Sequence, residues 1–295
     1  MGQPRVAEPK RAPVRIVSYL LSGSPSYGFV VGDGVVDRSA VPGVTAPTVR
    51  DLIAGGVLPD EAVVAAIAPT AALADVQLLP PVVPGKVLCA GVNFPTHRAE
   101  TGQAPEKPAH PVIFSRFADS HVAQGEDIRR PAETEAFDYE GELAVVIGTR
   151  AWHVSVDDAL DHVFGWSVYN DGSVRDWQRH SPQWIPGKNF WRSGAFGPEI
   201  VTAGSVADIG AARLQTRVNG EVRQDALISD MAFSVAELIA YCSTFTPLEP
   251  GDVIAAGTPG GVGLFFDPPR LLSDGDVVEI EIDGVGLLRN TIRQA

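Results

Sequence analysis

Paired turn signals between short apolar runs are the feature that most constrains how this chain can fold. An Asn-Gly pair lies within 214–224, an Asp-Gly pair within 277–290, and a Gly-Asp-Gly triplet within 27–37. These residues suit the positive φ angles of tight hairpin turns. The chain is therefore expected to form antiparallel hairpins of short strands, and not the alternating strand–helix units of a parallel sheet.

The other elements predict the same fold class. The apolar runs 15–21 and 164–171 are expected to be strands. Helices are fewer. Residues 234–242 start with a serine and a glutamate at capping-box spacing, and residues 155–164 carry an apolar stripe behind a serine cap. The sum is an α+β architecture that is mostly β.

A proline-rich segment at 78–87 is expected to divide the chain, because prolines and glycine cluster in linkers. We expect a small N-terminal domain over 15–80, which includes an Ala/Val-rich stretch with helical spacing at 48–68. The main domain would cover 86–295. The polar, proline-bearing residues 1–14 are expected to be a disordered tail.

Composition argues against several classes of protein. The formal net charge is −13, so a nucleic-acid partner, which requires basic patches, is not expected. No apolar run reaches the ~18 residues of a membrane span, and no secretory signal is visible, so we expect a cytoplasmic protein with no membrane partner. The two cysteines, Cys89 and Cys242, argue against a disulfide framework and for a reducing compartment.

Two glutamates, Glu140 and Glu142, precede the apolar run 143–147. In a strand they would point to the same face, beside a segment that is apolar on both faces. Like charges there are costly unless they are neutralised. Asp171 is a third candidate, and three carboxylates without cysteine or paired histidine suit Mg²⁺, Mn²⁺ or Ca²⁺. From spacing alone, a metal site and a solvated strand edge are about equally good interpretations.

His97 and Glu100 lie three residues apart in 91–102. On a short helix their side chains would be neighbours, and a carboxylate beside an imidazole orients it and raises its basicity. The other interpretation is an incidental surface ion pair. Taken alone, the surface pair is favoured, because exposed pairs are common and weak.

Polar side chains follow Asp171 in 170–190: Arg175, Gln178 and Lys188. They could bind an anionic substrate or a developing oxyanion, or they could belong to a solvated loop. The tryptophans of this region are expected to serve in packing: Trp177, Trp184 and Trp191.

The glycine-rich segment 255–263 lacks the spacing of a phosphate- or dinucleotide-binding loop. One interpretation is a loop whose backbone N–H groups and Thr258 hydroxyl meet a ligand anion. The other is a tight turn.

Taken in order, several segments resemble the fumarylacetoacetate hydrolase family. The resemblance covers residues 86–295, and the ordered set is specific although each segment alone is not. The segments are NFPTHRAETG, FDYEGELAVVIG, NDGSVRDWQ, GKNF, LEPGDVIAAGTPGGVG and GDVVEIEIDGVGLLRN. The resemblance implies a roll or sandwich of mixed β-sheets with a small N-terminal domain, commonly assembled as a homodimer.

The resemblance also implies roles for the candidate residues. It assigns a divalent ion, Mg²⁺ or Mn²⁺ with Ca²⁺ as a further candidate, to Glu140, Glu142 and Asp171. It assigns catalysis to His97, Glu100 and Lys188, and substrate binding to Arg175, Gln178 and Thr258.

The implied activity is cleavage of a C–C bond by hydrolysis in an acylpyruvate-like 2,4-dioxo acid, a small anionic 2-oxo acid. His97, oriented by Glu100, would activate a water, and the metal would hold the resulting enolate. One alternative is an isomerase or decarboxylase of a related 2-hydroxymuconate-type dicarboxylate in aromatic catabolism. Another is a non-catalytic or biosynthetic-cluster relative with a repurposed pocket.

The chain departs from the family pattern in three places. Asn93-Phe94-Pro95 stands where many members have an Asn-Tyr pair, and Arg116 stands where a lysine is common. Residues 189–196 are bulkier than usual. These departures predict an unusual substrate.

Overall fold

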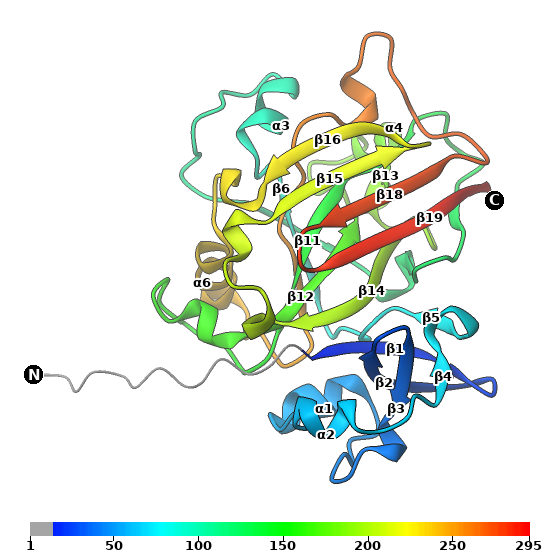
Figure 1. The fold of residues 1–295 in the computed structure, drawn as a ribbon. Coiled ribbons are helices and arrows are strands. Elements are labelled where there is room, and N and C mark those ends of the chain that lie inside the picture. Colours follow the sequence, from blue (N-terminus) through cyan, green and yellow to red (C-terminus); the bar gives the residue numbers. More distant parts are fainter. Residues whose placement is uncertain (1–13) are drawn as a thin grey trace, which may run out of the picture.

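The computed structural model describes residues 14–295 and is mostly β, as predicted (Figure 1). The predicted tail, residues 1–14, lies outside the described residues except for Val14, whose N–H donates to Thr202 Oγ1 at 3.2 Å. Within the described part of the chain, no helix is both long enough and apolar enough to cross a membrane.

A large mixed sheet of twelve strands forms the centre of the molecule, with the order β4-β3-β2-β1-β14-β12-β11-β17-β6-β7, β5 on β1 and β8 on β14. Most neighbours are antiparallel, but β17 runs parallel to β6, and β8 runs parallel to β14. The strands are β1 (Arg15–Leu21), β2 (Ser24–Val31), β3 (Gly34–Asp37), β4 (Ala71–Ala72), β5 (Gln77–Leu79), β6 (Val87–Gly91), β7 (Val112–Arg116), β8 (His121–Val122), β11 (Gly141–Ile147), β12 (Val163–Asn170), β14 (Gly194–Thr202) and β17 (Val253–Ala255).

A second sheet of five strands has the order β16-β15-β18-β19-β9, and β10 pairs with β13 in a small third sheet. Figure 1 shows β15, β16, β18 and β19 side by side over one part of the large sheet. The strands are β9 (Ile128–Arg130), β10 (Phe137–Asp138), β13 (Ser173–Val174), β15 (Arg213–Val218), β16 (Glu221–Leu227), β18 (Val277–Ile282) and β19 (Gly286–Gln294).

The N-terminal strands join the large sheet, because β1 pairs antiparallel with β14. Figure 1 shows β1 to β5 gathered with helices α1 (Val49–Gly55) and α2 (Glu61–Ala65) at the lower end of the view. Both helices lie within the stretch 48–68 that was predicted to be helical. The division into domains at 15–80 and 86–295 stays a prediction.

The predicted hairpins form. The turn between β15 and β16 has Asn219 and Gly220 at φ angles of 52° and 80°, as a type I′ turn requires. Gly32 and Asp33 connect β2 to β3, and a loop containing Asp283 connects β18 to β19. Local turn chemistry therefore fixed the strand pairing at these three places.

The helix predicted over 234–242 is confirmed, whereas the helix predicted over 155–164 is wrong. α6 (Val235–Phe245) starts with the expected capping box between Ser234 and Glu237. In 155–164 a short 3-10 helix, Ala159–His162, leads directly into β12. There Val163 pairs with Ile147 of β11, and this tertiary pairing outweighs the local helical pattern.

Strand β11 is covered on both faces, as its uninterrupted apolar run predicted. Leu143, Val145 and Ile147 lie in the core cluster shared with the second sheet. Ala144 and Val146 lie in the cluster that extends to the N-terminal strands. Full burial of such side chains stabilises a fold by roughly 1.5–3 kcal/mol each for valine, leucine and isoleucine. The strand is therefore a rigid support for the charged residues at its start.

Candidate active site

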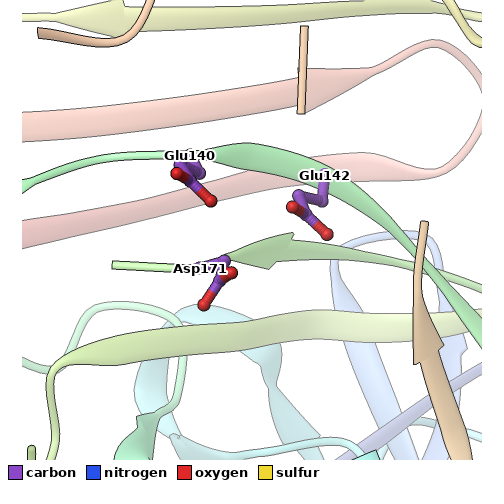
Figure 2. A group of neighbouring side chains, drawn as sticks. All are labelled: Glu140, Glu142 and Asp171. Carbon is purple, nitrogen blue, oxygen red and sulfur yellow. The ribbon is translucent and has the colours of Figure 1, made fainter. Parts of the chain in front are cut away.

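Three carboxylates, those of Glu140, Glu142 and Asp171, face one another where β11 begins and β12 ends (Figure 2). The two strands are antiparallel with Gly141 opposite Asn170, and the Asp171 N–H donates to the Glu140 carbonyl oxygen at 2.9 Å. All three side chains are buried, and one oxygen of each lies within 4.8 Å of the others. A solvated strand edge is thereby excluded.

Cationic side chains neutralise two of these carboxylates. Lys188 Nζ donates to Glu140 Oε2 and to Asp171 Oδ2, both at 2.7 Å. Arg175 Nη1 donates to Glu140 Oε1 and Arg116 Nη1 to Asp171 Oδ1, each at 2.5 Å. Burial alone would raise the pKa of Glu140, but Lys188 and Arg175 outweigh it and lower that pKa. Burial disfavours the Lys188 ammonium, yet its acidic partners raise the Lys188 pKa, so the side chain stays charged.

Glu142 differs from the other two because no cationic partner pairs with it among residues 14–295. Its Oε2 accepts the Gly257 N–H at 2.9 Å, and the residue is 2 % exposed. Burial raises the Glu142 pKa well above its ordinary value, and the charges of Asp171 and Glu140 raise it further. A divalent cation would offset this penalty, and an all-oxygen donor set suits a hard ion. The residues present therefore fit a divalent metal.

The Gly257 N–H reaches Glu142 only because position 257 has no side chain. Its φ angle is +103°, and a Cβ there would lie 2.6 Å from the Cβ of Asn93. Asn93 is itself fixed, since its amide donates to the carbonyl oxygens of Phe233 and Ala256 at 2.9 and 2.7 Å. Asn93 therefore helps to fix the loop that carries the Gly257 N–H.

His97 and Glu100 lie on α3 (Pro95–Glu100), and they are not the exposed pair that the sequence alone favoured. His97 is 5 % exposed, and its Nδ1 lies 2.7 Å from Glu100 Oε1. Because a carboxylate can only accept, Nδ1 is the donor, and Nε2 of the neutral ring is left as the acceptor. Glu100 Oε2 also accepts the Gly261 N–H at 2.9 Å. The imidazole is thus oriented as a base, with its tautomer set by Glu100.

The glycine-rich loop directs its N–H groups to the chain's own acids. The pairs are Gly257 with Glu142, Gly261 with Glu100 and Gly263 with Asp138. These groups order the site, and so do not serve as the anion cradle that was one interpretation of the sequence. Thr258 Oγ1 accepts from Gln224 Nε2 at 2.7 Å, which leaves the hydroxyl hydrogen free to be donated.

Asp138 and Gln224 belong to the site but were not predicted from the sequence. Asp138 Oδ2 accepts from Arg175 Nε at 2.9 Å, so it positions the guanidinium. The alternation of acids at 138, 140 and 142 was an available signal. Gln224 accepts the Gly141 N–H at 3.0 Å in addition to holding Thr258. No local pattern marked it, because its partners are far away in the sequence.

Arg116, which stands where a lysine is common in the family, forms a buried ion pair with Asp171. The fully buried guanidinium also donates to the Gly172 carbonyl oxygen at 3.0 Å, Ser193 Oγ at 2.9 Å and Ser120 Oγ at 3.1 Å. A lysine has one nitrogen and cannot make this set of contacts.

Replacing Arg116 with methionine is expected to lower the free energy of unfolding by about 3 kcal/mol, because Asp171 and two hydroxyls lose a buried partner. Urea unfolding measures this loss. Arg289→Met is the control, since Arg289 is 52 % exposed and faces Glu279 at 3.4 Å, a pair worth less than about 1 kcal/mol. Equal losses in the two variants would contradict this role of Arg116.

Most of the residues described above line one cavity of about 550 Å³. The predicted residues that line it are Glu140, Glu142, His97, Arg175, Gln178, Lys188 and Thr258. Glu100 and Asp171 are outside this lining, in contact with His97 and Lys188. Trp184 packs against the core, as expected, and also lines the cavity. Trp191, which was also expected to serve in packing, is 64 % exposed.

Comparison with known proteins identifies the family of the chain. Residues 86–293 match the model of the fumarylacetoacetate (FAA) hydrolase C-terminal family. The chain is 40% identical over 267 residues to a mitochondrial oxaloacetate tautomerase of Bos taurus, covering 88% of this chain and 84% of that protein. It is 41% identical over 223 residues to an oxaloacetate tautomerase of Bacillus subtilis, covering 75% and 74%.

Among solved structures, a fumarylacetoacetate hydrolase from Exiguobacterium antarcticum superposes with a TM-score of 0.85 at 33% identity, covering 96% of this chain and 100% of that one. The fold, the segment matched and the shared identity agree with the resemblance noted in the sequence. The chain therefore belongs to the fumarylacetoacetate hydrolase family.

Proposed function

We propose that the chain is a divalent-metal-dependent isomerase that interconverts the enol and keto forms of a small 2-oxo dicarboxylate such as oxaloacetate. The observation that carries this proposal is the buried imidazole of His97, oriented through Nδ1, which lines one cavity together with Glu140 and the unpaired Glu142. A base beside a site for a divalent cation is what proton transfer next to a carbonyl requires.

Glu140, Glu142 and Asp171 would hold Mg²⁺ or Mn²⁺. When bound, such a cation supplies electrostatic stabilisation of the negative charge that develops as a 2-oxo acid becomes an enolate. Which ion is resident stays open between these and Ca²⁺, since all three prefer oxygen ligands.

The chain's own residues would move the proton and hold the substrate. In the enol-to-keto direction the enol oxygen loses a proton and the neighbouring carbon gains one. His97 Nε2 can accept the first proton and return one, because Glu100 stabilises the imidazolium. Lys188 and Arg175 are positively charged and line the cavity. With a divalent cation compensating the three carboxylates, these two side chains would offset the substrate's negative charge. Gln178 and the Thr258 hydroxyl would donate to a carboxylate.

The isomerase takes precedence over the C–C hydrolase that the sequence first suggested. Both tautomerases named above have oxaloacetate in their names, and they match this chain at about two-fifths identity over three quarters of its length or more. Hydrolysis is the second candidate, because the same His97–Glu100 pair could deprotonate a water and the superposed solved structure is a fumarylacetoacetate hydrolase. The predicted homodimer and cytoplasmic location stay predictions.

Product analysis separates these candidates. The purified protein with Mg²⁺ is given enol oxaloacetate and, separately, acetylpyruvate, and NMR follows the products. We expect faster formation of keto oxaloacetate and no release of acetate and pyruvate from acetylpyruvate. Faster cleavage of acetylpyruvate than enol conversion would establish the hydrolase instead. Pyruvate and carbon dioxide as the main products from oxaloacetate would establish a decarboxylase.

A further inference from the structure

Trp184 lies between two cavities. The active-site cavity and a second one of about 570 Å³ share the lining residues Phe114, Pro182 and Trp184. The second cavity is mostly apolar, with Leu88, Ile113, Ile185, Tyr241 and Phe245 among its lining residues. The side chain of Trp184 is thus part of the partition that separates the charged site from an apolar space.

The indole is seated tightly. A Cβ on Gly91, the last residue of β6, would lie 2.3 Å from Trp184 Cζ3, so the six-membered ring lies directly over the glycine. The ring also meets Phe114 edge-on, with centroids 5.5 Å apart at 70°. Phe114 in turn lies under the Lys188 ammonium, 5.1 Å from its Nζ. Phe114 therefore links Trp184 to Lys188 of the charged site.

The backbone of Trp184 has an unusual conformation. Its φ angle is +63°, in the left-handed region, where a bulky residue is rare and persists only when its surroundings hold it. It directly precedes α5 (Ile185–Lys188), which carries Lys188. The contacts of the indole with Gly91 and Phe114 are among the surroundings that hold this conformation.

We propose that Trp184 is a specificity-determining residue that limits the substrate to a short acid by closing the site off from the apolar cavity. This inference rests on the proposed function. The charged cavity recognises the 2-oxo acid head, and the indole blocks any long apolar substituent at the opposite end. Without the indole, an alkyl chain could extend along Leu88 and Tyr241.

The test uses Trp184→Gly, because glycine adopts a positive φ angle without strain and the variant therefore removes the side chain while suiting the backbone. Trp184→Phe keeps an aromatic partition. Trp191→Ala is the matched control, since Trp191 is nearby in the chain, is 64 % exposed and lines neither cavity. Circular dichroism confirms that each variant is folded.

Calorimetry with Mg²⁺ then gives the Kd of a series of 2,4-dioxo acids, from acetylpyruvate to chains with several more methylenes. In Trp184→Gly we expect the longest member to bind about 10-fold or more tightly than in the wild type, since each buried methylene adds to affinity. Trp184→Phe should give a smaller gain, and Trp191→Ala should match the wild type.

Equal chain-length dependence in the wild type and in Trp184→Gly, with acetylpyruvate still bound, would overturn the proposal. Turnover of enol oxaloacetate is measured on the same samples. A wild type that binds the series but does not convert oxaloacetate would refute the proposed function alone, because the binding ratios would still report on Trp184.

Discussion

Replacing Glu142 with glutamine is expected to weaken divalent-metal binding by ~10²-fold or more, because it replaces one of three carboxylate ligands with an uncharged amide. Isothermal calorimetry with Mg²⁺ and Mn²⁺ measures the loss. The same substitution is expected to raise the stability of the metal-free protein by roughly 1–3 kcal/mol, because it removes a buried charge with no cationic partner. Weaker metal binding combined with a more stable metal-free fold is the signature of a ligand, and a merely structural glutamate would not show both.

The stability gained in Glu142→Gln depends on pH. Burial raises the Glu142 pKa above its ordinary value of 4.5 in the folded state, and the neighbouring acids raise it further. The folded metal-free protein therefore holds this proton more tightly than the unfolded chain does, and the resulting stability is lost as pH rises above 4.5 through the folded-state pKa. The gain from Glu142→Gln should accordingly be larger at neutral pH than at acidic pH.

Glu281→Gln is the matched control. Glu281 also belongs to a pair of glutamates two residues apart in a strand, but its side chain is 48 % exposed and pairs with Arg217. Metal binding by this variant should equal that of the wild type. Unchanged metal affinity in Glu142→Gln would contradict the assignment of the triad as a metal site.

Replacing His97 with asparagine is expected to lower kcat by ~10²–10⁴-fold, the usual contribution of a positioned acid–base group. The substitution removes Nε2, the ring nitrogen that accepts and returns the proton in the proposed reaction, while Glu140, Glu142 and Asp171 keep their places. Metal affinity by calorimetry should therefore stay close to that of the wild type. Stopped-flow loss of the enol absorbance measures kcat.

His153→Asn serves as the control for His97. His153 is exposed, and its φ angle of 54° is one that asparagine adopts readily. This variant should keep the full rate. A His97→Asn enzyme with a rate near that of His153→Asn would rule out His97 as the base and require another proton carrier.

Much of the fold followed from local chemistry in the sequence. Asn219-Gly220 fixed one hairpin because few residue pairs adopt two positive φ angles, and Ser234 with Glu237 fixed the start of α6. The helix predicted over 155–164 failed for a non-local reason. Val163 pairs with Ile147 in β11, and no pattern within the segment records that pairing.

In the candidate site, too, some residues could be predicted from the sequence and others could not. The spacing of Glu140 and Glu142, with Asp171 at a strand end, made these three carboxylates candidates in the sequence. Antiparallel pairing of β11 and β12 brings them together, because it places the start of one strand beside the end of the other. The residues that hold this cluster in place could not be predicted from the sequence. Arg116 reaches Asp171 across 55 residues and Gln224 reaches Thr258 across 34, so only the folded chain shows these contacts.

The most direct test of a metal-dependent isomerase is the rate at which enol oxaloacetate disappears before and after metal removal. The protein is treated with EDTA, dialysed, and assayed without and then with added Mg²⁺ or Mn²⁺. We predict that the rate falls to that of the buffer alone and returns when either ion is added, with keto oxaloacetate as the product. Full activity in the metal-free protein would contradict the account.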